Sequence, residues 1–405
     1  MKSFRRLVSN VQEGSLYVLL FLLPFSKAAV ESFFGVLLAT WLIARLDPAT
    51  RRESVWFTPQ FAGLRRALLA FLLVCALSIA VSQNPMLSLN GVVNKWAEYL
   101  MLFVIATDIA ARRPVAERLP RVLAAAAIFV LFEAVTQERY GWGFFRNYRL
   151  DFFRRTTGPY ENPIDLATFL IVILPPLITA TVLNRAHRSR ALGWGVLVAA
   201  LMICLVRTEA VGAWLGLGLG LILMALRHAP LRRYLAAALA VAVLAGGFFI
   251  MKGKTSTQYS FSEIGTWDRW MMWQAAFGMI KDRPILGHGV NTFMSKYLEY
   301  WVGGERQPRY AHNCYLQVTA ETGILGLVTF VWLLALLLRH VAAGIADLPP
   351  PDRLRLIGLA GGLVGFLAQA GLDTNFYALR QAALFWTMAG LAVGMTARLP
   401  APRRG

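Results

Sequence analysis

The sequence predicts an all-α, polytopic integral membrane protein with about twelve transmembrane helices. Of the 405 residues, 57% are apolar and 16% are charged, and the mean hydropathy is +0.53. Twelve segments of about 20 residues, the length that spans a bilayer, would occupy about 240 residues. The composition therefore excludes an ordinary soluble domain. A net charge of +19 would suggest nucleic acid as the partner of a soluble protein, but in a membrane protein the location of the charges decides.

The apolar runs, bounded by Pro, Gly and charge clusters, define the predicted spans. They lie near residues 11–26, 28–44, 67–82, 92–111, 119–137, 161–183, 191–206, 209–226, 234–251, 313–338, 354–372 and 376–397. The first run ends on Ser26 and Lys27 without a small-residue cleavage pattern, so it is predicted to be a span rather than a removed signal peptide. Residues 1–405 are therefore expected to form one membrane domain.

Basic residues predict the orientation of these spans. The seven segments placed on the cytoplasmic side hold three to five Lys or Arg each, and 24 of the 41 in total. The turns at 83–91 and 373–375, on the opposite side, hold none. This is the distribution that the positive-inside rule describes, and it predicts that both termini are cytoplasmic.

Most of the remaining basic residues gather on the outer face. Lys27 stands alone, five arginines lie within 139–155, and eight Lys or Arg lie within 252–311. Long loops escape the positive-inside rule, but the shorter segment at 139–155 runs against it. This excess of positive charge predicts an anionic ligand on the outer face. The last three basic residues fall in or beside apolar runs: Lys95, Arg207 and Arg380.

The outer loop at 138–160 interleaves arginines with aromatic residues. Aromatic rings favour the headgroup level of a membrane, and the planar guanidinium group matches phosphate oxygens. A site for a lipid-linked phosphate or pyrophosphate is therefore predicted, formed by Arg146, Arg149, Arg154 and Arg155 together with Lys27. An aromatic belt that contacts ordinary anionic lipid is the alternative.

The large outer loop at 252–312 is expected to contain an amphipathic helix from Thr266 to Lys281 at the membrane interface. Its apolar residues recur at steps of three and four: Trp270, Trp273, Phe277 and Ile280. Arg269 is expected in the first turn, where the helix macrodipole disfavours a cation unless an anion binds there. Arg269 is thus a candidate for anion binding, and a snorkelling surface arginine is the alternative.

His312 immediately precedes the tenth predicted span. Histidine accepts a proton near neutral pH, and the outer edge of the bilayer is accessible both to water and to a membrane-bound substrate. His312 is therefore a candidate general base, although a single interfacial histidine is more often inert. Glu321, nine residues on, would lie about 180° around a continuous helix and is not expected to orient His312.

Charged residues at membrane depth are costly, so each is a functional candidate. They are Glu31, Lys95, Glu98, Asp108, Glu133, Asp165, Arg207, Glu209 and Asp373. Lys95 and Glu98, three residues apart on one helix, are expected to pair. No DxD, HExxH or Walker-type pattern lies in an outer loop, and the three cysteines show no CxxC spacing. No metal, cofactor or disulfide framework is therefore predicted.

Four sequence blocks follow one another along the chain. They are Gly158–Pro163 (GPYENP), Thr208–Gly216 (TEAVGAWLG), Arg269–Gly289 (RWMMWQAAFGMIKDRPILGHG) and His312–Gly326 (HNCYLQVTAETGILG). Together they resemble the O-antigen ligase family, which also includes O-antigen polymerases and protein O-oligosaccharyltransferases. The resemblance covers about residues 15–395.

The resemblance implies a fold like that of the C-type glycosyltransferases and an enzyme of the bacterial inner membrane with a periplasmic active site. Such an enzyme transfers a glycan from undecaprenyl pyrophosphate to an acceptor, which for a ligase is a sugar hydroxyl of lipid A core. His312 matches the family's loop histidine and Arg269 its loop arginine, with Asn313 as an adjacent substrate-binding candidate. A histidine base and arginines that stabilise the leaving pyrophosphate would give inverting transfer without a metal.

One position departs from the family pattern, and two alternatives stay open. The family usually has an arginine where this chain has Val211, and Arg207, one turn earlier, is the candidate substitute. The single large loop, followed by three spans, favours a ligase over a polymerase or a protein O-oligosaccharyltransferase. A twelve-span secondary transporter is the competing class. It should place ionisable residues near the midplane of repeated halves, whereas this chain concentrates them in outer loops and shows no internal repeat.

Overall fold

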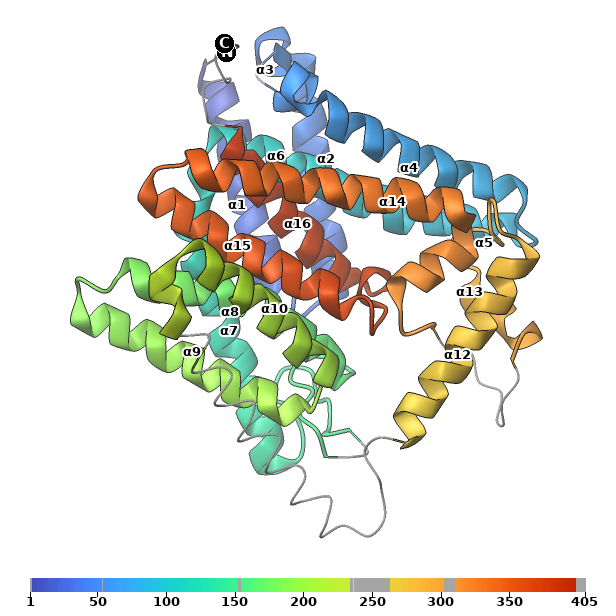
Figure 1. The fold of residues 1–405 in the computed structure, drawn as a ribbon. Coiled ribbons are helices and arrows are strands. Elements are labelled where there is room, and N and C mark those ends of the chain that lie inside the picture. The colour runs from blue at the N-terminus through green and yellow to red at the C-terminus, as the bar shows by residue number, and fades with distance from the viewer. Residues whose placement is uncertain are drawn as a thin grey trace.

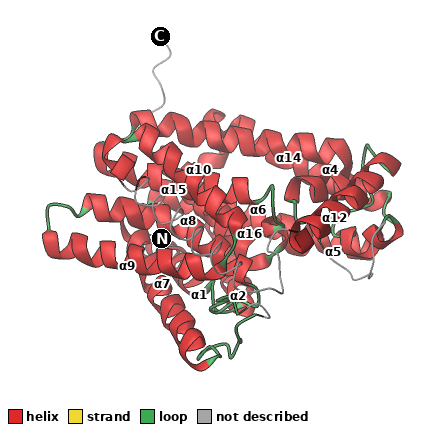
Figure 2. Cartoon of the chain, turned by 60° about the horizontal axis from the view of Figure 1, so that its bottom comes forward, coloured by secondary structure: helices red, strands yellow, loops and turns green. Residues whose placement is uncertain are grey.

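The computed structural model of the protein describes residues 2–52, 54–151, 154–233, 236, 263–301 and 310–397. Over these residues the chain is helical, and its one pairing of extended backbone is an isolated bridge between Trp142 and Arg149 (Figure 2). The predicted all-α class is therefore confirmed for the part of the chain that is described.

The helices are joined mostly by short connections (Figure 1). The longer ones are α1 (Lys2–Leu22), α2 (Lys27–Leu46), α4 (Ala62–Ala80), α6 (Glu98–Arg112), α7 (Val115–Tyr140), α8 (Pro163–Leu183), α9 (Arg188–Thr208), α10 (Val211–Arg227), α12 (Glu263–Asp282), α14 (Cys314–Asp347), α15 (Pro350–Gln369) and α16 (Leu379–Thr396). The shorter ones are α3 (Pro48–Arg52), η1 (Val55–Phe57), η2 (Pro59–Phe61), α5 (Pro85–Gly91), the π-helical η3 (Val92–Ala97), η4 (Ala229–Leu231), α13 (Phe293–Lys296), η5 (Tyr297–Glu299) and η6 (Asn375–Tyr377).

Six of the described helical segments are long and apolar enough to cross a membrane. They are Lys27–Leu46, Pro59–Ala80, Val115–Tyr140, Pro163–Leu183, Arg188–Thr208 and Cys314–Asp347. The protein is thus a helical membrane protein, as its composition predicts. Eleven of the predicted spans overlap helices of the structure, whereas the ninth, at 234–251, lies outside the described residues except for residue 236. The total of twelve stays a prediction.

Glycines bring three of the helices into close contact. A side chain at Gly216 or Gly220 of α10 would overlap the backbone carbonyl of Gly365 or Gly361 of α15, and one at Gly362 would overlap α8. In a bilayer, small residues at such crossings allow the backbones to approach and gain dispersion contacts. The glycine-rich stretch in α10 therefore serves helix packing, and it holds α8, α10 and α15 together beside the site.

α14 is interrupted near its N-terminal end. Gly323 has φ 69° and ψ −172°, which is not a helical conformation. The break frees the carbonyl groups of Ala320 and Glu321, which accept hydrogen bonds from the backbone N–H groups of His288 and Gly289 at 3.1 and 2.8 Å. The loop that follows α12 is thereby docked onto α14 by main-chain hydrogen bonds.

The buried carboxylate of Glu321 holds the same loop from its other side. It accepts hydrogen bonds from the backbone N–H of Asn291 at 2.7 Å and of Phe293 at 3.3 Å, and from the Tyr377 hydroxyl at 3.0 Å. Among the described contacts of Glu321 there is none with His312, in agreement with the prediction. Glu321 organises the loop instead.

The helix expected from Thr266 to Lys281 is present as α12, which begins earlier, at Glu263. One face packs on α14 and the neighbouring segments through buried small and flexible residues: Met271, Met272, Ala275, Ala276 and Met279. On the other face, Trp270 and Phe277 are 48% and 52% exposed. α12 therefore combines a protein contact with outward-facing aromatic rings of the kind that favour a membrane interface.

Candidate active site

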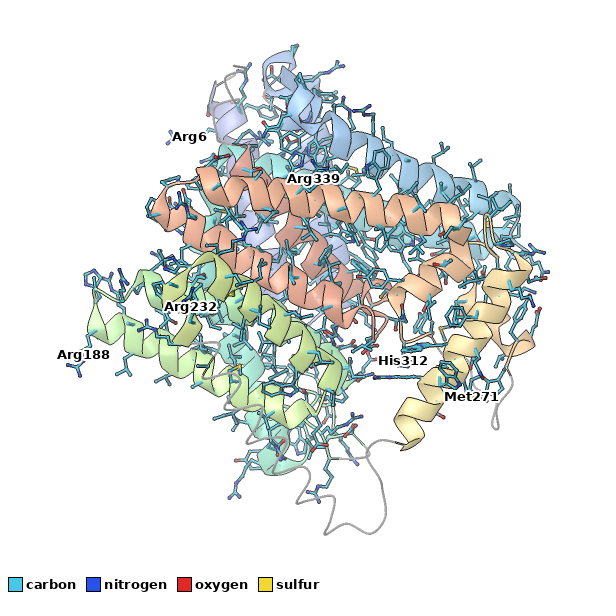
Figure 3. All side chains as sticks on the ribbon, viewed as in Figure 1. Arg6, Arg188, Arg232, Met271, His312 and Arg339 are labelled. Carbon is cyan, nitrogen blue, oxygen red and sulfur yellow. The ribbon has the colours of Figure 1, made fainter. Side chains whose placement is uncertain are left out.

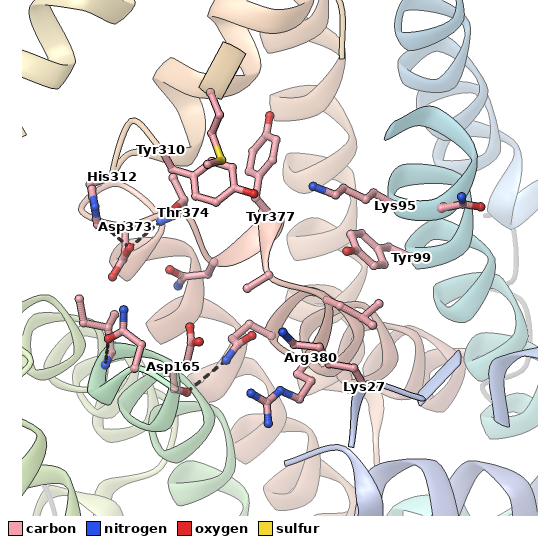
Figure 4. A pocket seen from close by; sticks show the side chains of 18 of the residues that line it. Lys27, Lys95, Tyr99, Asp165, Tyr310, His312, Asp373, Thr374, Tyr377 and Arg380 are labelled. Carbon is pink, nitrogen blue, oxygen red and sulfur yellow. Dashed lines mark hydrogen bonds and ion pairs between the residues drawn. The ribbon is translucent and has the colours of Figure 1, made fainter. Parts of the chain in front are cut away.

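A cavity of about 610 Å³ lies where several helices begin (Figure 4). The first turns of α2, α8 and α16 contribute to its wall, and His312 lies just before α14. The charged side chains of the wall are three cations, Lys27, Lys95 and Arg380, and three carboxylates, Glu31, Asp165 and Asp373. Because helix N-termini carry partial positive charge, their convergence adds positive potential to the cavity.

His312 pairs with Asp373 in this wall. The Nδ1 atom of His312 lies 3.2 Å from Oδ1 of Asp373, which also accepts a hydrogen bond from the backbone N–H of Thr374 at 2.8 Å. An ionised carboxylate only accepts hydrogen bonds, so the neutral imidazole carries its hydrogen on Nδ1. The lone pair then resides on Nε2, which is the arrangement a general base requires.

The backbone on both sides of this pair is tied down. Cys314 donates its backbone N–H to the carbonyl groups of Ala370 and Asp373 at 2.8 and 3.1 Å, and its thiol donates to the Asp373 carbonyl at 3.2 Å. The Asn313 side chain caps α14 by accepting two hydrogen bonds from backbone N–H groups at 3.0 Å. Asn313 lies outside the cavity lining, so the structure gives this predicted substrate-binding residue a capping contact.

Arg380 is the most rigidly held cation of the cavity. It is 3% exposed, and its Nη1 donates to the carbonyl groups of Pro24 at 2.7 Å and Pro159 at 3.0 Å. Its guanidinium lies 4.2 Å from the ring centroid of Tyr160. The sequence marks Arg380 only as a basic residue in an apolar run, and its cost at that depth was the signal that could have identified it as a site residue.

Lys95 forms another part of the wall. Its Nζ donates to Oδ1 of Asn291 at 2.7 Å and lies 5.8 Å from the ring centroid of Tyr377. The expected ion pair with Glu98 is absent from the described ion pairs, because Lys95 lies in the π-helical η3, where side chains depart from α-helical spacing. Lys95 is thus connected through Asn291 to the loop that Glu321 organises.

Lys27 links the cavity to the arginine-rich loop. Its Nζ lies 3.4 Å from Oε1 of Glu161, which accepts from the Tyr148 hydroxyl at 3.1 Å, and Arg146 donates to that hydroxyl at 2.9 Å. Burial raises the pKa of Glu161, but the charge of Lys27 and the hydrogen bond from Tyr148 outweigh it and lower the pKa below its usual value. Glu161 is therefore ionised at neutral pH and connects the two regions.

The other predicted arginines lie outside the cavity lining. Arg155 forms an ion pair with Asp151 at 2.6 Å, and Arg149 and Arg154 are exposed. Arg207 pairs with Glu138 at 2.7 Å on α7, and Val211 is 59% exposed. The structure therefore places neither Arg207 nor Val211 at the cavity.

Arg269 is also outside the lining, half-buried on α12. The expectation that it lies in the first helical turn is wrong, because α12 begins six residues before it, at Glu263. The helix-dipole argument for anion binding at Arg269 therefore no longer applies, since that effect is confined to the first turn. Of the nine predicted site residues, the cavity brings together His312 and Lys27.

The described residues offer no group of three or more His, Cys, Asp or Glu side chains with the geometry of a metal site. Cys75, Cys204 and Cys314 are all buried free thiols. The strongest ligand-binding groups of the cavity are its cations, and lysine and arginine are suited to phosphate oxygens.

Residues 194–331 match a protein-family model described as O-antigen ligase. The matched segment runs from α9 to the middle of α14 and includes α12, the loop docked on Glu321, and His312. No match was found among curated proteins. The family that the sequence motifs predict is confirmed by this match. Over residues 194–331 the chain is therefore similar to the O-antigen ligase family.

Proposed function

We propose that this protein is an O-antigen ligase that transfers a glycan from undecaprenyl pyrophosphate to a sugar hydroxyl of lipid A core, at the periplasmic face of the inner membrane. The observation that carries the proposal is the His312 and Asp373 pair in the same cavity as Lys27, Lys95 and Arg380. A base for the acceptor and cations for the leaving group are what transfer from a pyrophosphate donor needs.

The positive charge of the cavity supports binding of the donor's pyrophosphate. Three cationic side chains and the N-terminal ends of α2, α8, α14 and α16 surround the same space. Arg380 is held by two carbonyl groups and one aromatic ring, so little reorganisation is needed when charge develops on the leaving group.

The predicted residues outside the cavity have a secondary place in this proposal. Arg146 is linked to Lys27 through Tyr148 and Glu161, so the loop reaches the rim of the cavity. We propose that seven predicted residues contact lipid phosphates or the glycan as the substrates approach the cavity, or support the site indirectly. They are Arg146, Arg149, Arg154, Arg155, Arg207, Arg269 and Asn313.

In the proposed reaction, Nε2 of His312 takes the proton of the acceptor hydroxyl. The hydroxyl oxygen forms a bond to the anomeric carbon of the donor, the bond from that carbon to the phosphate oxygen breaks, and undecaprenyl pyrophosphate leaves with the electron pair. Asp373 orients the imidazole and stabilises the imidazolium that forms. A single displacement inverts the anomeric configuration. Because Lys27, Lys95 and Arg380 offset the negative charge, the proposed step uses no metal.

The test is the lipopolysaccharide profile of a strain that lacks the protein, complemented with the wild type or with His312→Gln. Loss of a ligase leaves a full core without polymer, while lipid-linked polymer accumulates. Only the wild type should restore the polymer-bearing bands. A core that carries a single repeat would overturn the proposal in favour of a polymerase. An unchanged profile would exclude both and leave protein glycosylation or transport.

A further inference from the structure

The cavity also contains a carboxylate that the proposed reaction does not use. The side chain of Asp165 lines the wall, and its carboxylate has no hydrogen bond or ion pair within the described part of the chain. Its main chain is fixed, because the N–H donates to the Asn162 carbonyl at 3.1 Å and the carbonyl accepts from Nε2 of Gln381 at 3.4 Å. A carboxylate repels a pyrophosphate, so Asp165 has to face another part of the ligand.

A second polar group of the wall also lacks a partner. Asn375 is 4% exposed, and its amide nitrogen has no hydrogen-bond partner among the residues that the structure describes. An unsatisfied buried donor costs about 1 to 3 kcal/mol, so a rotation that turns this amide toward a ligand with an acceptor in the cavity would be favourable. Asn375 lies two residues after Asp373, in η6. The unpaired donor and the unpaired carboxylate thus line the same cavity as the proposed base.

The carboxylates of the cavity and its cations are not evenly mixed around the wall. In the view of Figure 4, Asp165, Asp373 and His312 lie toward one side and Lys95 and Tyr99 toward the other, with Arg380 and Lys27 between them at the lower edge. The charges of Asp373 and Arg380 both act on Asp165, so these groups are within electrostatic range of one another. A carboxylate that accepts and an amide that donates are the complementary partners of sugar hydroxyls.

We infer that Asp165 and Asn375 form a sugar subsite beside the His312 and Asp373 pair, and that it takes an uncharged polyhydroxylated ring. This inference rests on the proposed function and specifies its substrate. Two carboxylates in one partly enclosed subsite disfavour a ring that bears its own carboxylate or phosphate, because like charges repel strongly where water is scarce. The ring belongs either to the acceptor or to the first sugar of the donor. Both carry the hydroxyl groups that the subsite recognises.

Asp165 also has an ordinary structural explanation, for which the chain offers a control. It lies in the first turn of α8 after the cap Asn162, where a negative charge stabilises the helix dipole. Glu117 has the corresponding place in the first turn of α7 and lies outside the cavity lining. Glu117→Gln therefore removes a charge of the same kind without touching the cavity.

The experiment measures initial rates of transfer by the full-length protein in lipid, with acceptor and donor varied separately, for the wild type, Asp165→Ala, Asp165→Asn, Asn375→Leu and Glu117→Gln. Asp165→Ala should raise the KM of one sugar substrate by about tenfold to a hundredfold, the usual value of a hydrogen bond to a charged group. Asp165→Asn and Asn375→Leu should have smaller effects in the same direction, and Glu117→Gln none. The substrate whose KM rises identifies the ring.

Acceptor analogues supply a second readout. The wild type should prefer a neutral hexose over the matching uronic acid, and Asp165→Asn should narrow that preference. Binding of the delipidated core oligosaccharide and of the free repeat oligosaccharide, measured by calorimetry, tests the subsite without relying on transfer.

Three outcomes would overturn the sugar subsite. The first is an unchanged KM for both substrates in Asp165→Ala. The second is a loss confined to kcat, which would assign Asp165 to proton transfer. The third is a decrease only in the amount of folded protein, which Glu117→Gln reproduces. Failure of the proposed function gives a different result, since the wild type would then transfer no glycan at all. In that case, the calorimetric test still applies: if Asp165→Ala binds each of the two oligosaccharides as tightly as the wild type does, the subsite is also refuted.

Discussion

The Nδ1 atom of His312 lies 3.2 Å from Oδ1 of Asp373, although the two residues are 61 positions apart. His312 has a φ of 46°, in the left-handed region that residues other than glycine rarely adopt. The Asn313 cap and the hydrogen bonds of Cys314 to the Asp373 carbonyl hold the chain in this conformation. Strained backbone of this kind persists where the surrounding structure determines it, and it is frequent at active sites.

Replacing His312 should abolish proton abstraction. His312→Ala and His312→Gln should both lower single-turnover transfer by about 10² to 10⁴-fold, since neither side chain can take the proton. Transfer by the wild type should also fall on acidification, because a protonated imidazole has no lone pair to accept a proton. Binding of the lipid pyrophosphate donor should be nearly unchanged, as cations hold it. An active Gln variant would rule out His312 as the base.

Asp373→Asn should reduce transfer by about 10²-fold or more while leaving the fold intact. The amide of asparagine can donate to Nδ1, which stabilises the tautomer with its hydrogen on Nε2 and removes the lone pair from the reacting atom. Asp352→Asn, which alters an ion pair with Arg355 away from the cavity, is the matched control. Equal activity of the two variants would show that Asp373 does not orient His312.

Arg380→Lys should be nearly as inactive as Arg380→Ala. A lysine keeps the charge but lacks the planar group that contacts Pro24, Pro159 and the Tyr160 ring together. Loss of a preorganised charge of this kind costs roughly a hundredfold in kcat. The same two substitutions at Arg269 test whether α12 takes part in leaving-group stabilisation. Full activity of Arg380→Ala in folded protein would exclude Arg380 from the reaction.

Gly323→Ala should destabilise the protein and disorganise the loop docked on α14. A side chain at this position would overlap the backbone of Ile285 and Leu286, and the combination of φ 69° with ψ −172°, which almost only glycine adopts, adds about 1 to 3 kcal/mol of strain for an L-residue. Gly193→Ala, at a helical glycine with open space around it, should be neutral or slightly stabilising. Thermal unfolding of the two variants in detergent measures the difference, and equal midpoints would contradict the role given to the break.

The predicted orientation can be tested by labelling single cysteines. The native thiols are all buried, so an impermeant reagent should report mainly on an introduced cysteine. Arg149→Cys and Arg188→Cys both replace exposed residues, and Figure 3 shows the Arg188 side chain pointing away from the helices. The positive-inside distribution predicts labelling of position 149 from the periplasm and protection of position 188 in intact cells. The reverse pattern would invert the topology.

The sequence predicts the membrane-helical class because that class depends on composition and on apolar runs, which are local properties. It predicts the family that residues 194–331 match, and it singles out His312 as the candidate base, for the same reason, since the motifs are short and contiguous. It does not show which of the predicted arginines have carboxylate partners in the folded chain. Arg155 and Arg207 have carboxylate partners, Asp151 and Glu138, and lie outside the cavity. A count of charges along a loop does not show which of them are neutralised by neighbours.

Only the tertiary structure brought Asp373, Asp165, Lys95 and Arg380 to the same cavity as His312. The sequence alone marked Asp373, Asp165 and Lys95 as charged residues at membrane depth, and it marked Arg380 only as a basic residue in or beside an apolar run. Their meeting depends on the break at Gly323, on the glycine contacts between α10 and α15, and on Arg380 reaching the Pro24 carbonyl 356 residues away. Such contacts follow from how helices pack on one another, which local patterns do not encode, whereas burial of apolar surface in lipid is encoded by every span separately.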